Sequence, residues 1–299
     1  MWEPQGRMRI RTNTSKLSKR VMEENDTRFQ KVGALLGKKE LQEAYMEVER
    51  IINSSRPFPF TLMKCAALLL TVDKKERSDE VASMALGCPL KDDDEIVQLS
   101  IAMRGLGRYG DSLSLLERVG TDLSGLDLER ARTLIASGDA DSCLEILDSI
   151  AGIEADLIRC GALSRTGSHD EAIALAKKIV EDRGLDYETG SLLLGSMLRA
   201  GLVKEAKRLA NSMVKDAKDA DSLALKAYVM RINGRTPAAM NYANQSLLKE
   251  PCHIGALWNL ALCLLEKGRK DEAKLLAGAI NEASPASPLA LEILDLCNR

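Results

Sequence analysis

The chain has 299 residues, of which 29% are charged and 3% aromatic, and its formal net charge at pH 7 is −2. Seven cysteines without a C-x-x-C pair, together with only two histidines, argue against a disulfide framework and a four-ligand zinc site, so we expect no metal and no cofactor. The longest apolar stretch, Ile254 to Leu265, is interrupted by Asn259 and is shorter than the roughly 20 residues that span a bilayer. We therefore expect no membrane partner.

The first segment, residues 1–22, is basic. Residues 1–21 carry a net charge of +5, which leaves −7 for the remainder of the chain. This segment lacks the apolar core of a secretory signal, which favours a cytoplasmic location. We expect a disordered tail; the alternatives are contact with nucleic acid or with an acidic protein surface, and a protein that begins at Met8. The charged residues are Glu3, Arg7, Arg9, Arg11, Lys16, Lys19 and Arg20.

Residues 23–286 repeat one pattern of small residues eight times. The i, i+3, i+4 spacing of apolar residues predicts helices, and no strand-like alternation persists. We expect each unit to be a helix A, a turn and a helix B, because antiparallel helices approach closely only where side chains are small. No linker divides the repeats, which favours one elongated repeat domain. The first small column of helix B is Ala44, Val81, Ser112, Cys143, Ala172, Ala206, Ala239 and Ala273, and the second is Val48, Ala85, Leu116, Leu147, Ala176, Ala210, Ala243 and Ala277.

The turns between helix A and helix B set the length of the unit. We place them at Lys39 and Glu76 in the first two units and at a glycine in the next six, with intervals of 37, 31, 31, 29, 34, 33 and 34 residues. In the sixth unit Leu194 stands where other A helices have a small residue, and we expect a slip of one residue that puts Gly195 there. The turn glycines are Gly107, Gly138, Gly167, Gly201, Gly234 and Gly268.

The later units resemble the tetratricopeptide repeat family. Pro251 and Pro285, which are 34 residues apart, resemble its inter-repeat proline. The resemblance implies an all-α, right-handed superhelical solenoid of about eight helix-turn-helix hairpins. We expect a capping helix over residues 287–299 to end it, with Leu289, Ile293 and Leu296 on its buried stripe. The residues of the last unit that carry the resemblance are Leu257, Leu260, Ala261, Leu264, Gly268, Glu272, Ala273, Ala277, Ile280 and Pro285.

No arrangement of residues predicts catalysis. His169 and His253 fall in loops, so the sequence does not indicate a base held beside a nucleophile. We interpret the acidic run Asp92 to Glu95 as a helix start stabilised by the helix dipole. A protein without enzymatic activity is therefore expected.

Arginines near the ends of the A helices form the candidate binding site. The resemblance implies a concave groove, lined mostly by helix A, that binds a peptide or a partner protein. Arginines in this groove can form a ladder that binds carboxylates, or they can simply compensate the dipole at helix C-termini. Tyr228 and Trp258 are expected to be apolar anchors, and Asn259 matches one position of the family's clamp for acidic tails. The arginines are Arg104, Arg132, Arg165, Arg199 and Arg231.

The sequence as a whole predicts a non-catalytic scaffold or adaptor for protein-protein interaction. Its partner is expected to be a protein or a peptide with acidic residues. The alternative is a nucleic-acid-associated helical-repeat protein that uses the basic N-terminal segment. Because the remainder of the chain is acidic, nucleic acid is not expected on the repeats themselves.

Overall fold

The computed structural model describes residues 16–38, 40–54, 58–120, 125–283 and 287–298. The chain divides into two compact units, one up to residue 57 and one from Phe58 onward. In the described residues all regular secondary structure is α-helical, and eight hairpins are followed by one last helix, as predicted. The first unit contains α1 (Lys16–Gly37) and α2 (Leu41–Ile52). The second unit contains α3 (Pro59–Thr71), α4 (Lys75–Leu86), α5 (Asp93–Gly105), α6 (Tyr109–Glu117), α7 (Leu126–Ser137), α8 (Ala140–Leu147), α9 (Ile153–Thr166), α10 (His169–Arg183), α11 (Tyr187–Arg199), α12 (Val203–Met213), α13 (Ala220–Ile232), α14 (Thr236–Lys249), α15 (Ile254–Glu266), α16 (Lys270–Ala283) and α17 (Pro288–Asn298).

Three sequence predictions fall on residues outside the described ranges. Residues 1–15, which make up most of the predicted tail, lie outside them, and α1 begins at Lys16 within the predicted tail. The predicted turn residue Lys39 and the inter-repeat Pro285 also lie outside the described residues.

Both predicted columns of small residues are confirmed as core positions. Every member of the two columns is at most 1% exposed. In several hairpins helix A has a small residue opposite the first column: the hydroxyl oxygens of Ser100 and Ser112 are 2.9 Å apart, and Cys160 Sγ donates to the carbonyl of Ala172 over 3.2 Å. The two backbones of a hairpin come this close because neither has a bulky side chain at the crossing.

Two finer packing predictions are wrong. Leu194 keeps the common register, twelve residues before Ala206, and is fully buried. A Cβ on Gly195 would instead lie 3.7 Å from Tyr228 Oη, so there is no slip. On α17, Ile293 is fully buried as predicted, but Leu296 is 37% exposed, and Leu294 and Cys297 take its place. The buried stripe of α17 is shifted because this helix packs against α15 and α16 and also against α5.

The six glycines predicted in turns are confirmed there, and their backbones lie in the left-handed region, with φ between 72° and 97°. The turn predicted at Glu76 is wrong. Helix α4 already begins at Lys75, and the left-handed residue of this turn is Asp73, with φ 59°. Aspartate tolerates this conformation better than most residues because its short side chain can form local hydrogen bonds.

Aspartates mark the first residue before several helices. Asp92, Asp139, Asp186 and Asp219 each accept a hydrogen bond from the backbone N–H three residues later, at 2.8 to 3.1 Å. Such a side chain satisfies one of the free N–H groups at a helix start. The acidic run at Asp92 is therefore a helix start, as the sequence predicted.

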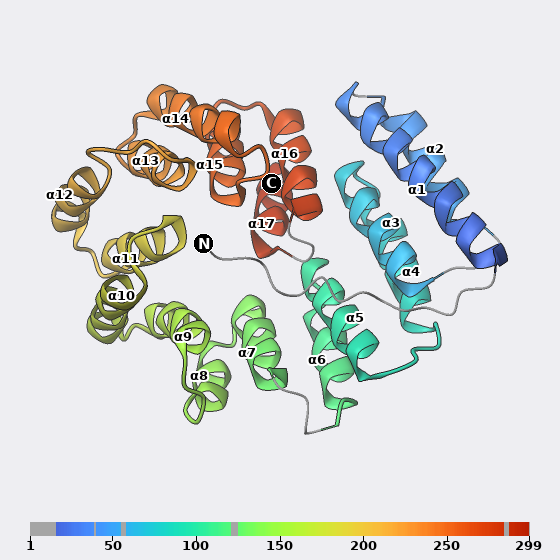
Figure 1. The fold of residues 1–299 in the computed structure, drawn as a ribbon, viewed down its shortest axis with the longest axis horizontal. Coiled ribbons are helices and arrows are strands. Elements are labelled where there is room, and N and C mark those ends of the chain that lie inside the picture. Colours follow the sequence, from blue (N-terminus) through green and yellow to red (C-terminus); the bar gives the residue numbers. More distant parts are fainter. Residues whose placement is uncertain (1–15, 39, 55–57, 121–124, 284–286, 299) are drawn as a thin grey trace. The chain divides into compact units, whose positions relative to one another are not determined.

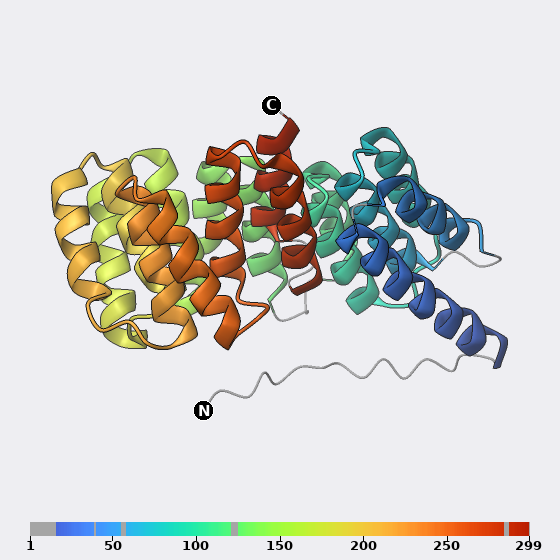
Figure 2. The same ribbon diagram turned by 90° about the horizontal axis from the view of Figure 1, so that it is seen from above.

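The hairpins of the second unit follow a curve (Figure 1) and their helices stand beside one another when the curve is seen from its edge (Figure 2). Odd-numbered helices from α7 to α15 lie on the inner side of this curve, and each odd-numbered helix from α3 to α17 contacts the next. We call the surface that these odd-numbered helices turn toward the middle of the curve the inner face. Helix α16 also packs against α3, and α17 against α5, so the second unit closes on itself.

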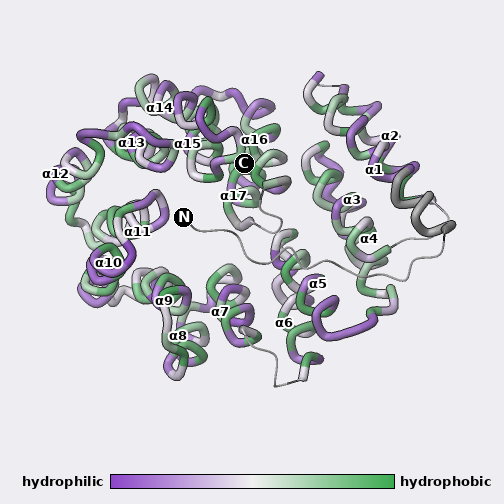
Figure 3. The backbone as a smooth tube through the Cα atoms, in the orientation of Figure 1, coloured by the Kyte–Doolittle hydropathy of each residue, from purple (hydrophilic) through white to green (hydrophobic). Residues whose placement is uncertain are grey.

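The labelled helices carry both hydrophobic and hydrophilic residues (Figure 3), as expected for helices with one face in a core. Among the described residues, no helix combines the length and the apolar character needed to cross a membrane.

Candidate functional site

The five predicted arginines lie on consecutive odd-numbered helices, from α5 to α13, and each contacts a neighbouring odd-numbered helix. They therefore connect successive repeats, and dipole compensation is not their only role. Their partners differ along the array. Two of the arginines form a first group, two form a second group, and Arg165 lies between the groups.

The first group, on α5 and α7, is neutralised by carboxylates. Arg104 Nη1 lies 2.8 Å from Glu129 Oε2 and 3.3 Å from Thr133 Oγ1, and its side chain is only 11% exposed. Arg132 donates to the other oxygen of Glu129 and, over 3.0 Å, to Glu154 on α9. Glu129 thus sits between two guanidinium groups. This part of the site holds helices together and has little positive charge to offer a partner.

Arg165, on α9, marks the change between the two groups. Its side chain is exposed, and its Nη1 donates to the backbone carbonyl of Ile135 at the end of α7. This carbonyl is at a helix C-terminus, where a cation is favoured. No carboxylate of the described residues forms an ion pair with Arg165.

The second group, Arg199 and Arg231, is held by neutral side chains through Nε alone. Arg199 Nε donates to Ser164 Oγ over 2.6 Å, and Arg231 Nε donates to Asn259 Oδ1 over 3.1 Å. In the part of the chain that the structure describes, neither arginine has a carboxylate partner, and none of their Nη atoms donates a hydrogen bond. Both guanidinium groups are thus oriented by the fold through Nε.

Aromatic rings support Arg231. Its guanidinium carbon is 5.1 Å from the centre of the Trp258 ring and 5.6 Å from that of Tyr228, within the range of cation–π attraction. Burial raises the pKa of Tyr228, although Arg231 and Arg199 act in the opposite direction. Trp258 Nε1 donates to Glu292 on α17 over 3.3 Å. The predicted aromatic anchors therefore belong to the same cluster as Arg231, where Tyr228 is mostly buried and Trp258 partly exposed.

Asn259 is part of this cluster but is fully buried. Its amide nitrogen donates to Tyr187 Oη over 2.9 Å and to the carbonyl of Gly255 over 2.8 Å, while its oxygen accepts from Arg231. All three contacts occupy the amide, so the geometry gives Asn259 the role of positioning Arg231, and no part of it reaches the surface.

Tyr187 is the residue that the sequence analysis missed. It begins α11 yet bonds to Asn259 on α15, and its ring lies edge-on to His253 with ring centres 5.7 Å apart. Burial raises its pKa. A Cβ on Gly255 would lie 2.3 Å from the Tyr187 ring, so glycine is required there. In the sequence, the indication of this contact is Gly255, a glycine within the first turn of α15. Tyr187 lies 68 residues before it.

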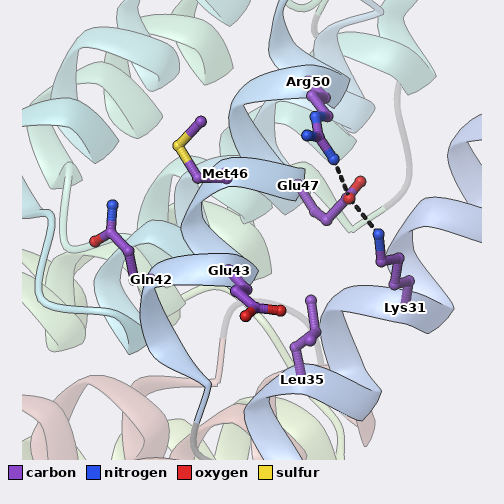
Figure 4. A pocket seen from close by; sticks show the side chains of 7 residues that line it. All are labelled: Lys31, Leu35, Gln42, Glu43, Met46, Glu47 and Arg50. Carbon is purple, nitrogen blue, oxygen red and sulfur yellow. Dashed lines mark hydrogen bonds and ion pairs between the residues drawn. The ribbon is translucent and has the colours of Figure 1, made fainter.

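The first unit has a separate charged cluster beside a shallow depression of about 280 Å³ on the α1/α2 hairpin (Figure 4). The almost fully buried carboxylate of Glu47 receives Lys31 Nζ at 2.5 Å and Arg28 Nη1 at 3.2 Å, and also binds Arg50. The hydrogen bond from Lys31 is the main cause that lowers the pKa of Glu47, against the effect of burial. These contacts join α1 to α2, which gives the cluster a structural role. The residues around the depression are Lys31, Leu35, Gln42, Glu43, Met46, Glu47 and Arg50.

The described ranges contain all seven cysteines, and none of them is paired in a disulfide. No group of three or more His, Cys, Asp or Glu residues in these ranges has the arrangement of a metal site. Burial raises the pKa of Cys143 and of Cys263 to about 11, which keeps both thiols protonated at neutral pH.

Several solved structures are similar to this chain. A tetratricopeptide repeat protein from Parabacteroides merdae ATCC 43184 matches 81% of this chain and 99% of its own, with 12% identity and a TM-score of 0.47. The APC/C hetero-tetramer Cut9–Hcn1 matches 90% of this chain and 55% of its own chain, with 14% identity and a TM-score of 0.43. YrrB, a tetratricopeptide protein with an unusual peptide-binding site, matches 62% and 96%, with 14% identity and a TM-score of 0.31. No protein-family model and no curated protein matches the sequence.

The helices of the chain themselves define its class. Eight antiparallel hairpins, two buried columns of small residues and six left-handed turn glycines are the features of a tetratricopeptide-like repeat array. The last helix, α17, packs against the last hairpin, as a helix that follows the repeats should.

Proposed function

We propose that this protein is a non-catalytic scaffold whose inner face binds an acidic segment of a partner protein. The resemblance to tetratricopeptide repeats supports a role in protein interaction. The finer proposal concerns where the partner binds: at Arg199 and Arg231, with Tyr228 and Trp258 as the neighbouring apolar surface, and with Arg165 at one side.

The observation that carries this proposal is the way in which Arg199 and Arg231 are held. Fixing a guanidinium through Nε reduces the entropy that binding must overcome. Leaving its outer edge free and without a carboxylate partner keeps the charge for a ligand. Arg104 and Arg132 do not meet this condition, because Glu129 and Glu154 already occupy them. An aspartate- or glutamate-rich peptide fits the second group and not the first.

Two further parts of the proposal rest on the sequence. Absence of enzymatic activity follows from the lack of a base beside a nucleophile in the sequence. A cytoplasmic location is proposed from the seven cysteines without a disulfide framework.

The test is binding of a fluorescein-labelled oligo-glutamate peptide, measured by anisotropy at low salt. Charge reversal of both Arg199→Glu and Arg231→Glu is expected to weaken binding at least 100-fold, because each lost contact to a charged group is worth about 1.5–3 kcal/mol. Circular dichroism should show an unchanged helical signal.

The matched control is the double variant Arg104→Gln, Arg132→Gln. It removes two inner-face arginines of the neutralised group, and binding of the same peptide should change less than about threefold. Equal losses in both double variants would show that the peptide does not distinguish the two groups of arginines. Unchanged binding in the Arg199/Arg231 variant would place the binding surface elsewhere.

A further inference from the structure

The second unit closes through an ion pair between residues far apart in the sequence. Lys274 Nζ on α16 lies 2.6 and 2.5 Å from the two carboxylate oxygens of Asp73, in the turn between α3 and α4. The two residues are 201 positions apart, and the Lys274 side chain is only 14% exposed. An array in which each repeat touches only its neighbours needs no such contact.

Asp73 is also the residue with the most unusual backbone of the described ranges. It is the only non-glycine among them with positive φ, whereas the other six turns between helix A and helix B in the second unit have glycine. A side chain in a left-handed conformation costs free energy and persists where its surroundings require it. The ion pair with Lys274 supplies a reason for an aspartate at this position.

Small residues allow the helices to meet beside this ion pair. A Cβ on Gly278, one turn after Lys274, would lie 3.8 Å from Thr71 Cγ2 and 4.0 Å from its Oγ1. Leu70 packs against the hydrophobic core that α15, α16 and α17 share. Further along, Leu291 of α17 would be 3.7 Å from a Cβ on Gly107. Lys274 and Gly278 thus form a second face of α16, beside the face of Ala273 and Ala277 that packs inside its own hairpin.

We propose that this contact between α3 and α16, the seam, is a gate through which a partner reaches the inner face, and that Asp73 and Lys274 are its clasp. Chain connectivity does not hold the seam closed, and small rotations between the intervening hairpins are enough to part it. The clasp is weak enough to release, because the Asp73 side chain is 53% exposed and water and salt compete for it. The entry role rests on the proposed function, whereas opening of the seam does not.

The first experiment measures opening on the protein alone, by hydrogen exchange of peptides from α3 and α16. Asp73→Gly removes the carboxylate of the clasp. It introduces glycine, the residue found in the six later turns, so the turn itself should fold well. We expect exchange in these two helices to rise roughly 2- to 5-fold, with no change in α9 and α10. Added salt should have the same effect on the wild type and almost none on the variant. Equal exchange in wild type and Asp73→Gly would overturn the clasp.

The second experiment locks the seam with a disulfide. Thr71→Cys and Gly278→Cys place two thiols within reach of one another, in a background in which the two native cysteines that are not buried, Cys88 and Cys252, are serine. The oxidised protein is expected to bind the oligo-glutamate peptide at least 10-fold more slowly than the same protein after reduction. Association at equal rates in the two forms would overturn the gate.

Failure of the proposed function gives a different result. In that case the peptide binds neither the oxidised nor the reduced form, and also does not distinguish wild type from the Arg199/Arg231 variant. Hydrogen exchange of the Asp73→Gly variant still decides whether the seam opens.

Discussion

The arginines of the odd-numbered helices have different partners in the two parts of the array. On α5 and α7, Arg104 and Arg132 bind the carboxylates of Glu129 and Glu154. On α11 and α13, Arg199 and Arg231 bind a hydroxyl and an amide, and aromatic rings support Arg231. The same residue type at similar repeat positions thus pairs with carboxylates in one part and with neutral side chains in the other. The neighbours of an arginine, and not its place in the repeat, decide which role it has.

The largest loss of stability is expected from disrupting Tyr187, which bonds to Asn259 and so helps to position Arg231. In Gly255→Ala, the new methyl group overlaps the partly buried ring of Tyr187. We expect a loss of about 3 kcal/mol in the free energy of unfolding, since neither group can move without repacking the core. Urea denaturation measures it.

Gly195→Ala is the matched control for this variant. Its methyl group meets nothing closer than 3.7 Å, and alanine favours a helix by up to about 1 kcal/mol over glycine. Stability should therefore stay equal or rise. A similar loss in both variants would show that the Tyr187 contact is not the cause.

The next prediction compares the two groups of arginines directly. Glu129→Gln leaves Arg104 and Arg132 without their shared carboxylate, and Arg104 is mostly buried. We expect a loss of about 2 kcal/mol in the free energy of unfolding. Arg199→Gln, at an exposed position with one neutral partner, should cost less than about 1 kcal/mol. The reverse order of the two losses would contradict the division into a structural and a binding group.

The charged cluster around Glu47 in the first unit is expected to make the stability of this unit depend on pH. Because the pKa of Glu47 in the folded protein is below its ordinary value of 4.5, its ionised form stabilises the fold above that value. This contribution is lost as the pH falls from 4.5 through the lowered pKa of the folded state. Glu47→Gln should cost about 1–2 kcal/mol at pH 7, and the difference from wild type should shrink at pH 3. A difference that stays constant with pH would mean that the charge is not responsible.

The smallest effect concerns the order in which hairpins open. The sequence predicts that the first two helical hairpins, which lack turn glycines, open before the later ones. In the structure, however, α3 is supported by α16, while α1 and α2 belong to a separate compact unit. We therefore expect faster hydrogen exchange in α1 and α2 than in α3. Faster exchange in α3 would argue against the support from α16.

The sequence by itself determined the repeat architecture. Small residues at fixed spacing are a local pattern, because helix A and helix B of one hairpin are joined by a short turn and must pack at those positions. The columns from Ala44 to Ala273 and the left-handed turn glycines from Gly107 to Gly268 could be predicted for this reason. The arginines could be located in the same way, since their positions follow the helix ends.

Only the tertiary structure decided which of these arginines are available and where the array closes. Glu129 is 25 residues from Arg104, Glu154 is 22 residues from Arg132, and Tyr187 and Asn259 meet over 72 residues. Asp73 and Lys274 meet over 201 residues. Such contacts depend on how small rotations between successive hairpins add up along the curve. The residue pattern within one repeat does not determine this total rotation. The left-handed turn at Asp73 was missed for the same reason, because the ion pair that explains an aspartate there comes from the other end of the chain.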